Sequence, residues 1–333
     1  MGRSRNVWGP YEPDPNGPLV TSQPKESNER ADDDHLKPRY FNPDSVLQKS
    51  GHGSYVDLPN GETYLVHLTS RPFVPELRCT LGRETAIQKM QWTPDGWLRM
   101  ADGSNLAKIE VEEPNLPDVP MPEIPSLDDF DGEELGNWYY SPRQMPSTFA
   151  NATERPGWLR VRGEESLASL NRTSLLARKL TSVYATVTTK MEFEPEVYQH
   201  SAGLTIYYDN MNNIFLRKYY SQTLGGSAIS IVRLENGEKT EMLDTRVAVE
   251  DKPIYFRLNI EGRRTWFEWG YDGENWTKIG PDFDTTTFSD EYCKYGEFTG
   301  TMVGIAVTDA ALHEKTADFD FFDYEADETK PVD

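Results

Sequence analysis

Cysteine, basic charge and long apolar runs are all scarce in this 333-residue sequence. The two cysteines, Cys79 and Cys293, make neither a disulfide framework nor a CxxC metal site, and we expect two buried thiols in a reducing compartment. The 34 Lys and Arg residues are outnumbered by 55 Asp and Glu, and the formal net charge of −21 repels phosphate backbones and anionic membranes. We therefore expect neither a nucleic-acid partner nor a membrane partner.

Hydrophobic leader and spanning segments are also missing from the sequence. No apolar run approaches the roughly 18 residues that a membrane-spanning helix requires. The first ten residues, MGRSRNVWGP, lack the apolar stretch of a secretory signal. This predicts a cytoplasmic protein, although the native N-terminus can lie upstream of Met1.

The sequence does contain β-strand periodicity over most of its length. Hydrophobic and polar residues alternate over 183–193, 254–260 and 303–307, as expected for strands with one buried face. By such signals we count about ten strands in 127–325 and no convincing amphipathic helix. The aromatic share of 12% suits a β-rich core, and the pattern predicts an all-β fold.

Turn signals between these runs predict hairpins. Asn-Gly and Asp-Gly pairs stand at 60–61, 95–96, 236–237 and 272–273, each between strand-like segments. We also expect a leading strand around residues 6–12.

A proline-rich stretch divides the sequence. Residues 113–126 read EPNLPDVPMPEIPS, and their five prolines exclude a helix interior or a central strand. We expect this stretch to connect a first domain, 1–112, to a β-sandwich over 127–326, with a short tail at 327–333. Long strands over about 200 residues suit a lectin-like jelly roll. The polar residues 22–44 are expected to form a long loop.

Short motifs in a fixed order connect both parts of the sequence to one family. The first part contains VWGPYEP at 7–13, QKSGHGS at 48–54, YLVHL at 64–68, LGRETAIQ at 81–88 and DGWL at 95–98. The second part contains DDFDG at 128–132, SAGL at 201–204, FTG at 298–300 and ADFD at 317–320. Through these motifs the sequence resembles glycoside hydrolase family 43, the β-xylosidase and α-L-arabinofuranosidase group, in the branch with a C-terminal β-sandwich.

The resemblance implies the last two blades of a five-bladed β-propeller, followed by a concanavalin A-like jelly-roll β-sandwich. Family members invert the anomeric centre with a base, a general acid and a third carboxylate that tunes the acid. An inverting pair stands about 6.5–9.5 Å apart. Because the family places these residues before the WGPYE motif, the resemblance implies that this chain has no catalytic residues. Asp14 lies in a Pro-Asp-Pro stretch that resembles a base motif, but it follows WGPYE and is not assigned.

The resemblance also implies three site residues. Arg83 matches an arginine that donates to sugar hydroxyls, the alternative being an ion pair with Glu84. Phe298 matches a sandwich loop over the propeller mouth, where a ring can pack on a sugar; the alternative is an ordinary core or rim phenylalanine. His52, between two glycines, matches a histidine near a bound ion or water cluster and is the metal candidate; the alternative is a buried, hydrogen-bonded histidine.

No cofactor is required by this assignment. A structural Ca²⁺ is one interpretation of the acidic residues that bracket the sandwich, and solvated edge charges that block sheet pairing are the favoured one. These residues are Asp128, Asp129, Asp131, Asp318 and Asp320.

The function expected from the resemblance is hydrolysis of a β-xyloside or an α-L-arabinofuranoside, with a xylo-oligosaccharide or arabinoside as substrate. Lacking the acid and the base, the chain alone is expected to be inactive unless a second chain supplies the missing blades. The alternatives are a lectin-like, carbohydrate-binding sandwich and a non-functional fragment. Incomplete blades also predict a partner chain or self-association through partly exposed residues. These are Val56, Leu58, Tyr64, Val66, Leu68, Ile87 and Trp92.

Overall fold

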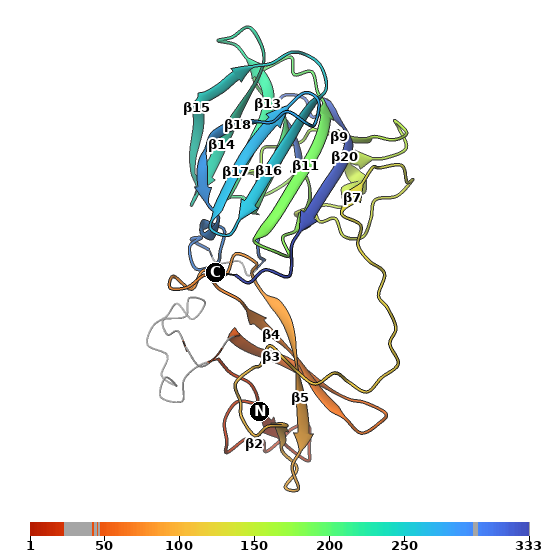
Figure 1. Ribbon diagram of the computed structural model, residues 1–333, viewed down its shortest axis with the longest axis vertical. Coiled ribbons are helices and arrows are strands. Elements are labelled where there is room, and N and C mark those ends of the chain that lie inside the picture. Colours follow the sequence, from red (N-terminus) through yellow and green to blue (C-terminus); the bar gives the residue numbers. More distant parts are fainter. Residues whose placement is uncertain (23–41, 43–44, 46, 296–298, 333) are drawn as a thin grey trace. The chain divides into compact units, whose positions relative to one another are not determined.

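The computed structural model of the chain describes residues 1–22, 42, 45, 47–295 and 299–332. These residues form two compact units, Met1–Met121 and Pro122–Asp333. Strands make up nearly all of the regular structure, and the described residues include no α-helix (Figure 1). Accordingly, the described part of the chain has no helix with the length and hydropathy needed to cross a membrane.

A four-stranded antiparallel sheet forms the centre of the first unit (Figure 1). Its strands, in order, are β3 (Gln48–Asp57), β4 (Thr63–Ser70), β5 (Glu84–Trp92) and β6 (Leu98–Met100). Each strand pairs with the next one along the chain, so the hairpins predicted at 60–61 and 95–96 are confirmed. A separate two-stranded sheet pairs β1 (Gly2–Arg3) with β2 (Glu12–Pro13). The described residues thus hold one four-stranded blade and a two-stranded sheet, where the sequence predicts two blades.

The leading strand expected around residues 6–12 is wrong. The segment before Glu12 is a turn, in which the Gly9 amide donates to the Asn6 carbonyl at 2.8 Å. Gly9 has a φ of 87°, in the left-handed region that an extended strand excludes. The polar loop expected over 22–44 lies, apart from residues 22 and 42, outside the described residues.

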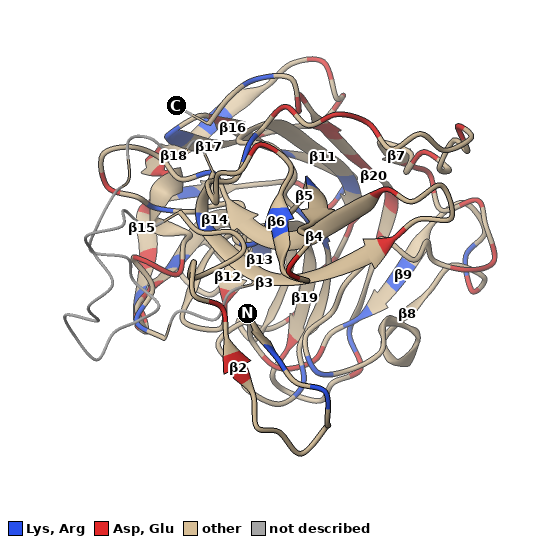
Figure 2. Cartoon of the chain, turned by 90° about the horizontal axis from the view of Figure 1, so that it is seen from below, with Lys and Arg blue, Asp and Glu red and all other residues tan. Residues whose placement is uncertain are grey.

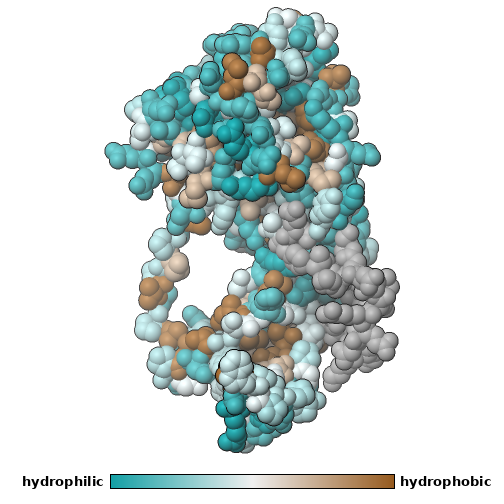
Figure 3. All heavy atoms as spheres, turned by 180° about the vertical axis from the view of Figure 1, so that it is seen from behind, coloured by the Kyte–Doolittle hydropathy of each residue, from teal (hydrophilic) through white to brown (hydrophobic). Residues whose placement is uncertain are grey.

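The two faces of the four-stranded sheet differ in burial. One face packs into an apolar cluster, whose buried members are Val20, Leu47, Leu65, Met90, Leu98, Met100 and Ala107. The opposite face leaves Val56, Val66 and Ile87 exposed by 45%, 40% and 38%, and Val66 lies directly opposite Ile87. Hydrophobic side chains accordingly appear on the surface of this unit (Figure 3). Tyr64, expected to be partly exposed, is buried instead, because its hydroxyl donates to the Glu112 carbonyl at 3.0 Å.

Two antiparallel sheets form the second unit (Figure 1). The six-stranded sheet has the order β10 (Ser174–Lys179), β19 (Met302–Asp309), β12 (His200–Asp209), β13 (Asn212–Ser221), β14 (Gly226–Glu235) and β15 (Glu238–Ala248). The eight-stranded sheet has the order β18 (Thr277–Asp284), β17 (Arg264–Gly270), β16 (Ile254–Glu261), β11 (Tyr184–Glu192), β20 (Thr316–Ala326), β9 (Leu159–Arg162) and β8 (Ala150–Asn151), with β7 (Leu127–Asp128) also paired to β20. The strands beyond the predicted ten are mainly the short β7, β8 and β9.

The eight-stranded sheet buries one face, as its alternating sequence predicts. In β11, Val187 and Met191 are fully buried, while Thr188 and Lys190 between them are partly exposed. Each large apolar side chain removed from water in this way contributes about 1.5–3 kcal/mol to folding. The alternation therefore fixes which face of β11 meets the core.

The six-stranded sheet differs because it is buried on both faces. All ten residues of β12 are buried. The face of this sheet that points away from the sandwich core is covered in part by Leu167, which packs with Phe215 of β13 and Ala306 of β19. Two-sided burial of this kind replaces the alternating pattern with a continuous run.

The hairpins predicted in the second unit are confirmed. Asn236 and Gly237 join β14 to β15 with φ angles of 49° and 87°, the left-handed pair that a two-residue hairpin turn requires. In the hairpin between β17 and β18, Asp272 accepts hydrogen bonds from the Asn275 side chain and amide and from the Glu274 amide. These bonds lower the pKa of Asp272 to about 2.

Candidate substrate site

The register of the first unit's sheet brings two of the predicted site residues to the same end. Thr69 and Ser70, at the end of β4, pair with the first residues of β5 and β3. The start of β3, the end of β4 and the start of β5 therefore lie together. His52 belongs to the first half of β3, and Arg83 immediately precedes β5.

His52 lies in an irregular part of β3. The pairing with β4 shifts register on both sides of Gly51, and His52 itself has a φ of 52°. Its side chain is exposed, so the alternative of a buried, hydrogen-bonded histidine is wrong. A Cβ at Gly53 would lie 2.9 Å from Leu65, so this glycine permits β3 to approach β4 closely.

A metal-linked role for His52 stays a prediction. Across the described ranges, no three His, Cys, Asp or Glu side chains are grouped so as to hold a metal ion. Two of the acidic residues considered for Ca²⁺ form ion pairs instead: Asp318 with Arg160 at 2.8 Å, and Asp320 with Lys190 at 2.7 Å. Acidic and basic residues are interspersed along the strands and loops of the described chain (Figure 2).

The Glu84 carboxylate is held by Arg71. The Nε and Nη2 atoms of Arg71 lie 3.1 and 2.7 Å from Glu84 Oε1, and the Arg71 amide donates to Oε2 at 3.2 Å. This fork uses both carboxylate oxygens. The role of Arg83, in substrate contact or in an ion pair, stays a prediction.

The connection between β4 and β5, which ends at Arg83, is well packed. Phe73 bridges to Arg78 and is fully buried, and Leu81 is buried as well. Gly82 has a φ of 71°, and its amide donates to the Cys79 carbonyl at 2.9 Å. The backbone just before Arg83 is thus fixed by a closed turn.

The histidine that is buried in this sheet is His67. Its Nδ1 lies 2.9 Å from the Leu68 carbonyl, and its Nε2 lies 3.3 Å from the side-chain nitrogen of Gln88. Burial lowers the pKa of His67, although the Leu68 carbonyl opposes this shift. The alternation of β4 could have indicated that His67 is buried, because His67 lies two residues after the buried Leu65.

Phe298 lies outside the described residues, so its predicted contact with substrate stays a prediction. The described residues that follow it re-enter the sandwich. Gly300 has a φ of 76°, and the Thr301 hydroxyl donates to the Phe288 carbonyl at 3.1 Å.

Several carboxylates of the first unit are unsuited to act as a general acid. Burial raises the pKa of Asp14, but the Asn16 amide and the Arg99 guanidinium outweigh this and hold it below its ordinary value. Partners also lower the pKa values of four further carboxyl groups, those of Asp57, Glu62, Asp95 and Asp102. A general acid at neutral pH requires the opposite shift.

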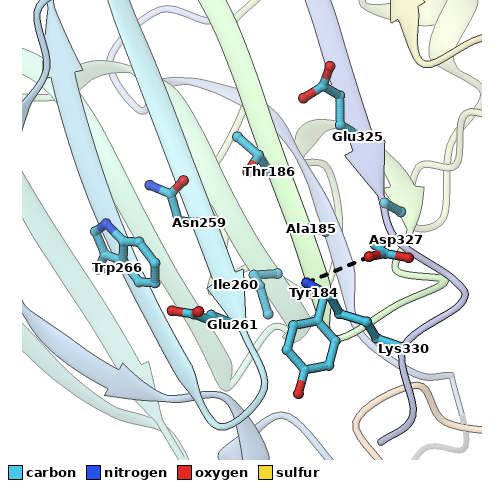
Figure 4. A pocket seen from close by; sticks show the side chains of 11 residues that line it. Tyr184, Ala185, Thr186, Asn259, Ile260, Glu261, Trp266, Glu325, Asp327 and Lys330 are labelled. Carbon is cyan, nitrogen blue, oxygen red and sulfur yellow. Dashed lines mark ion pairs between the residues drawn. The ribbon is translucent and has the colours of Figure 1, made fainter.

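An open hollow of about 440 Å³ lies against the eight-stranded sheet (Figure 4). Trp266 and Asn259 project from β17 and β16, and Tyr184 begins β11. The C-terminal segment adds Asp327 and Lys330, whose charged groups lie 3.6 Å apart. Hydrogen bonds from the Thr329 side chain and amide lower the pKa of Asp327. The hollow contains none of the predicted site residues.

Comparisons with known proteins match both units. Residues 1–98 match the model of glycosyl hydrolases family 43, and residues 127–325 match the beta xylosidase C-terminal concanavalin A-like domain. A xylan 1,3-beta-xylosidase of Vibrio sp is 33% identical over 97% of this chain and 59% of its own length. A xylosidase/arabinosidase 43B of Humicola insolens is 34% identical over 97% of this chain and 58% of its own length.

A solved structure agrees with these sequence matches. The xylan beta-1,4-xylosidase of Bacillus halodurans C-125 superposes with a TM-score of 0.87 and 40% identity, covering 97% of this chain and 59% of that one. The chain therefore belongs to glycosyl hydrolases family 43. Its branch is the one that carries the concanavalin A-like C-terminal domain, and the predicted all-β fold class is confirmed. The chain spans less than two thirds of the length of these relatives.

Proposed function

We propose that this chain forms part of a glycosidase that hydrolyses a β-xyloside or an α-L-arabinofuranoside by single displacement. The family membership and the names of the relatives, xylosidases and xylosidase/arabinosidases, support this substrate class. In this proposal the chain contributes substrate contacts, and the general acid, the base and the tuning carboxylate lie on residues other than these 333. No cofactor is needed for the reaction. The scarcity of cysteine, with two residues that are both buried, supports a cytoplasmic location.

The observation that carries the proposal is the position of Arg83. Its neighbour Glu84 is held by Arg71, and the closed turn at Gly82 fixes the backbone before β5. A guanidinium offers a fork of N–H donors that matches two adjacent sugar hydroxyls. We therefore propose Arg83 as the substrate-binding residue of the first unit, and the aromatic contact of Phe298 and the metal-linked role of His52 stay predictions.

Substitution of Arg83 tests this proposal. We would fuse the chain behind the part of the Bacillus halodurans xylosidase that it does not cover, and measure kcat/KM on an aryl β-xyloside and an aryl α-L-arabinofuranoside. Arg83→Ala should lower kcat/KM by about 10- to 100-fold, because hydrogen bonds from a charged donor are each worth about 1.5–3 kcal/mol. The kcat/KM of Arg83→Lys should lie between those of Arg83→Ala and the unsubstituted fusion, because lysine keeps the charge but lacks the forked N–H donors of the guanidinium.

Arg5→Ala is the matched control, because Arg5 is an exposed arginine of the same unit. It should leave kcat/KM unchanged, and thermal melts should show that the Arg83 variants fold. Full activity of a folded Arg83→Ala fusion would remove the proposed role of Arg83. A folded fusion without any activity would favour the alternative of a non-functional fragment.

The exposed face of the four-stranded sheet supports a partner for the first unit. Val56, Val66 and Ile87 lie on adjacent strands and are each exposed by about 40%. Burying such apolar surface contributes about 25 cal/mol per Å². We propose that this face packs either against the rest of the propeller on another polypeptide or against a second copy of the chain.

Light scattering across a salt series measures this association. Without the complementing part, the chain should form dimers or larger species, and their population should rise with salt because screening weakens the repulsion between chains of charge −21. Val66→Lys should reduce association, and Val119→Lys, an exposed valine outside the sheet, should not. A strictly monomeric chain at high protein and salt concentrations would contradict the proposal.

A further inference from the structure

A second hollow, of about 270 Å³, lies on the six-stranded sheet of the second unit. It is bounded by the face that points away from the sandwich core and by residues 166–168 and 198–199. Asn213, Phe215 and Arg217 alternate along β13 and therefore share this face. The pairing register adds side chains from β14 and β15 to the same face, namely Val232, Leu234, Lys239 and Glu241.

Two buried polar atoms, on residues that line this hollow, have no hydrogen-bond partner among the described residues. They are Arg217 Nε and Asn213 Oδ1. Asn213 is completely buried, and its Nδ2 donates to the Asp209 carbonyl at 3.1 Å, which leaves Oδ1 as the free acceptor. A buried donor or acceptor left unpaired costs about 1–3 kcal/mol, so a site that retains one of each is suited to a polar ligand.

Among the described residues, the one carboxylate that lines the hollow, that of Glu241, is already paired with both cations of the hollow. Arg217 Nη2 lies 3.5 Å from Glu241 Oε2, and Lys239 Nζ lies 2.7 Å from Glu241 Oε1. A ligand carboxylate would approach Glu241, in a chain whose net charge is −21. An uncharged ligand avoids this repulsion and can still use the free guanidinium N–H.

Apolar and aromatic surfaces complete the hollow. Phe215 and Leu234 come from the sheet, and Leu167 comes from the segment that covers it. Tyr198, from the connection before β12, is 59% exposed and can present its ring to a ligand. Apolar and aromatic surface packs against the C–H faces of a sugar, and hydrogen-bond donors and acceptors bind its hydroxyl groups. The hollow combines both features.

We propose that this hollow is a second saccharide site, which binds a neutral pentose unit of a xylo-oligosaccharide. Its volume lies just below the range of about 300–1,000 Å³ that is typical of ligand pockets, so it fits a short saccharide rather than a long chain. Arg217 Nε donates to one hydroxyl, Asn213 Oδ1 accepts from another, and Tyr198 covers a ring face. The choice of a pentose rests on the proposed function, but the site itself uses no residue of the first unit.

Isothermal titration calorimetry of the full chain with xylotriose tests the site. Tyr198→Ala should weaken binding about three- to tenfold, and Arg217→Lys about tenfold or more, since it keeps the charge and removes Nε–H. Ala168→Trp, at an exposed residue that lines the hollow, should abolish binding by filling it. Tyr198 and Ala168 are surface residues, so the variants at these two positions should fold even if substitution of Arg217 disturbs the core.

Two control variants leave the residues of the hollow unchanged. Tyr140→Ala removes a tyrosine of similar exposure, 53%, that does not line the hollow, and should change affinity by less than about twofold. Arg5→Ala, at an exposed arginine of the first unit, should leave xylotriose binding unchanged. The proposal is overturned if xylotriose does not bind, if the hollow variants bind as the unsubstituted chain does, or if D-glucuronate binds more tightly than xylotriose.

Discussion

We expect the 333 residues alone to hydrolyse neither an aryl β-xyloside nor an aryl α-L-arabinofuranoside. General acid and general base steps are each worth about 10²–10⁴-fold, and the proposed function places both groups on other residues. Five carboxyl groups of the first unit have lowered pKa values, and Glu84 is held in an ion pair by Arg71. Chromogenic assays at high enzyme concentration would measure the residual rate.

The fusion with the uncovered part of the Bacillus halodurans xylosidase is the positive control for these assays. It should restore turnover if the two parts complete one site. Robust turnover by the unfused chain would contradict the proposal if a substitution of one of its own Asp or Glu residues abolished that turnover. The acid would then have to be sought within the chain.

The largest stability effect is expected at Asp309, at the end of β19. Its side chain is 1% exposed and accepts four backbone hydrogen bonds, from the amides of residues 311, 312, 314 and 315, at 2.8–3.0 Å. Asp309→Asn replaces one acceptor oxygen by an NH₂ group that faces two of these donors. We expect a loss of about 3 kcal/mol in the free energy of unfolding of the second unit, measured by urea denaturation at neutral pH.

The pH dependence of this effect has a definite sign. Burial raises the pKa of Asp309, but the four amides outweigh burial and hold it well below the ordinary value of about 3.9. A depressed native pKa stabilises the fold above pH 4, and this stabilisation is lost as the pH falls through the native pKa. The difference between the wild-type chain and Asp309→Asn should therefore shrink in acid.

Asp244→Asn is the control for this substitution, because Asp244 is an exposed aspartate of the same unit. It should change the free energy of unfolding by less than about 0.5 kcal/mol. Equal free energies of unfolding for the Asp309→Asn and Asp244→Asn variants at neutral pH would contradict the stabilising role of the Asp309 carboxylate.

The sequence predicted correctly those strands and turns whose residue types match their burial and backbone angles. The alternation in β11 matches its one-sided burial, and the Asn236-Gly237 pair supplies the left-handed angles of its hairpin. The strand expected around residues 6–12 failed because hydrophobic residues alone do not report the left-handed Gly9. β12 is buried on both faces, so the hydropathy of its residues does not indicate which of its faces borders the hollow.

The candidate site was predicted in part. Arg83 was predicted from its motif and stays a prediction. The motif does not show that Arg71, thirteen residues from Glu84, holds the Glu84 carboxylate. Glycines beside His52 suggested a crowded, buried position, whereas the register shift in β3 leaves the imidazole exposed. Arg217 and Asn213 gave no sequence signal, because their proximity to Glu241 comes from the pairing of three strands.

The proline-rich connector has a practical consequence for separating the two units. No Lys or Arg occurs between Lys108 and Arg143, so trypsin has no cleavage site in the connector or at the start of the sandwich. Glu123, by contrast, is exposed within a stretch that has neither helix nor strand and is followed by isoleucine. A glutamate-specific protease is thus the appropriate reagent for releasing the sandwich, and a trypsin-resistant band near full length would not show that the two units are packed together.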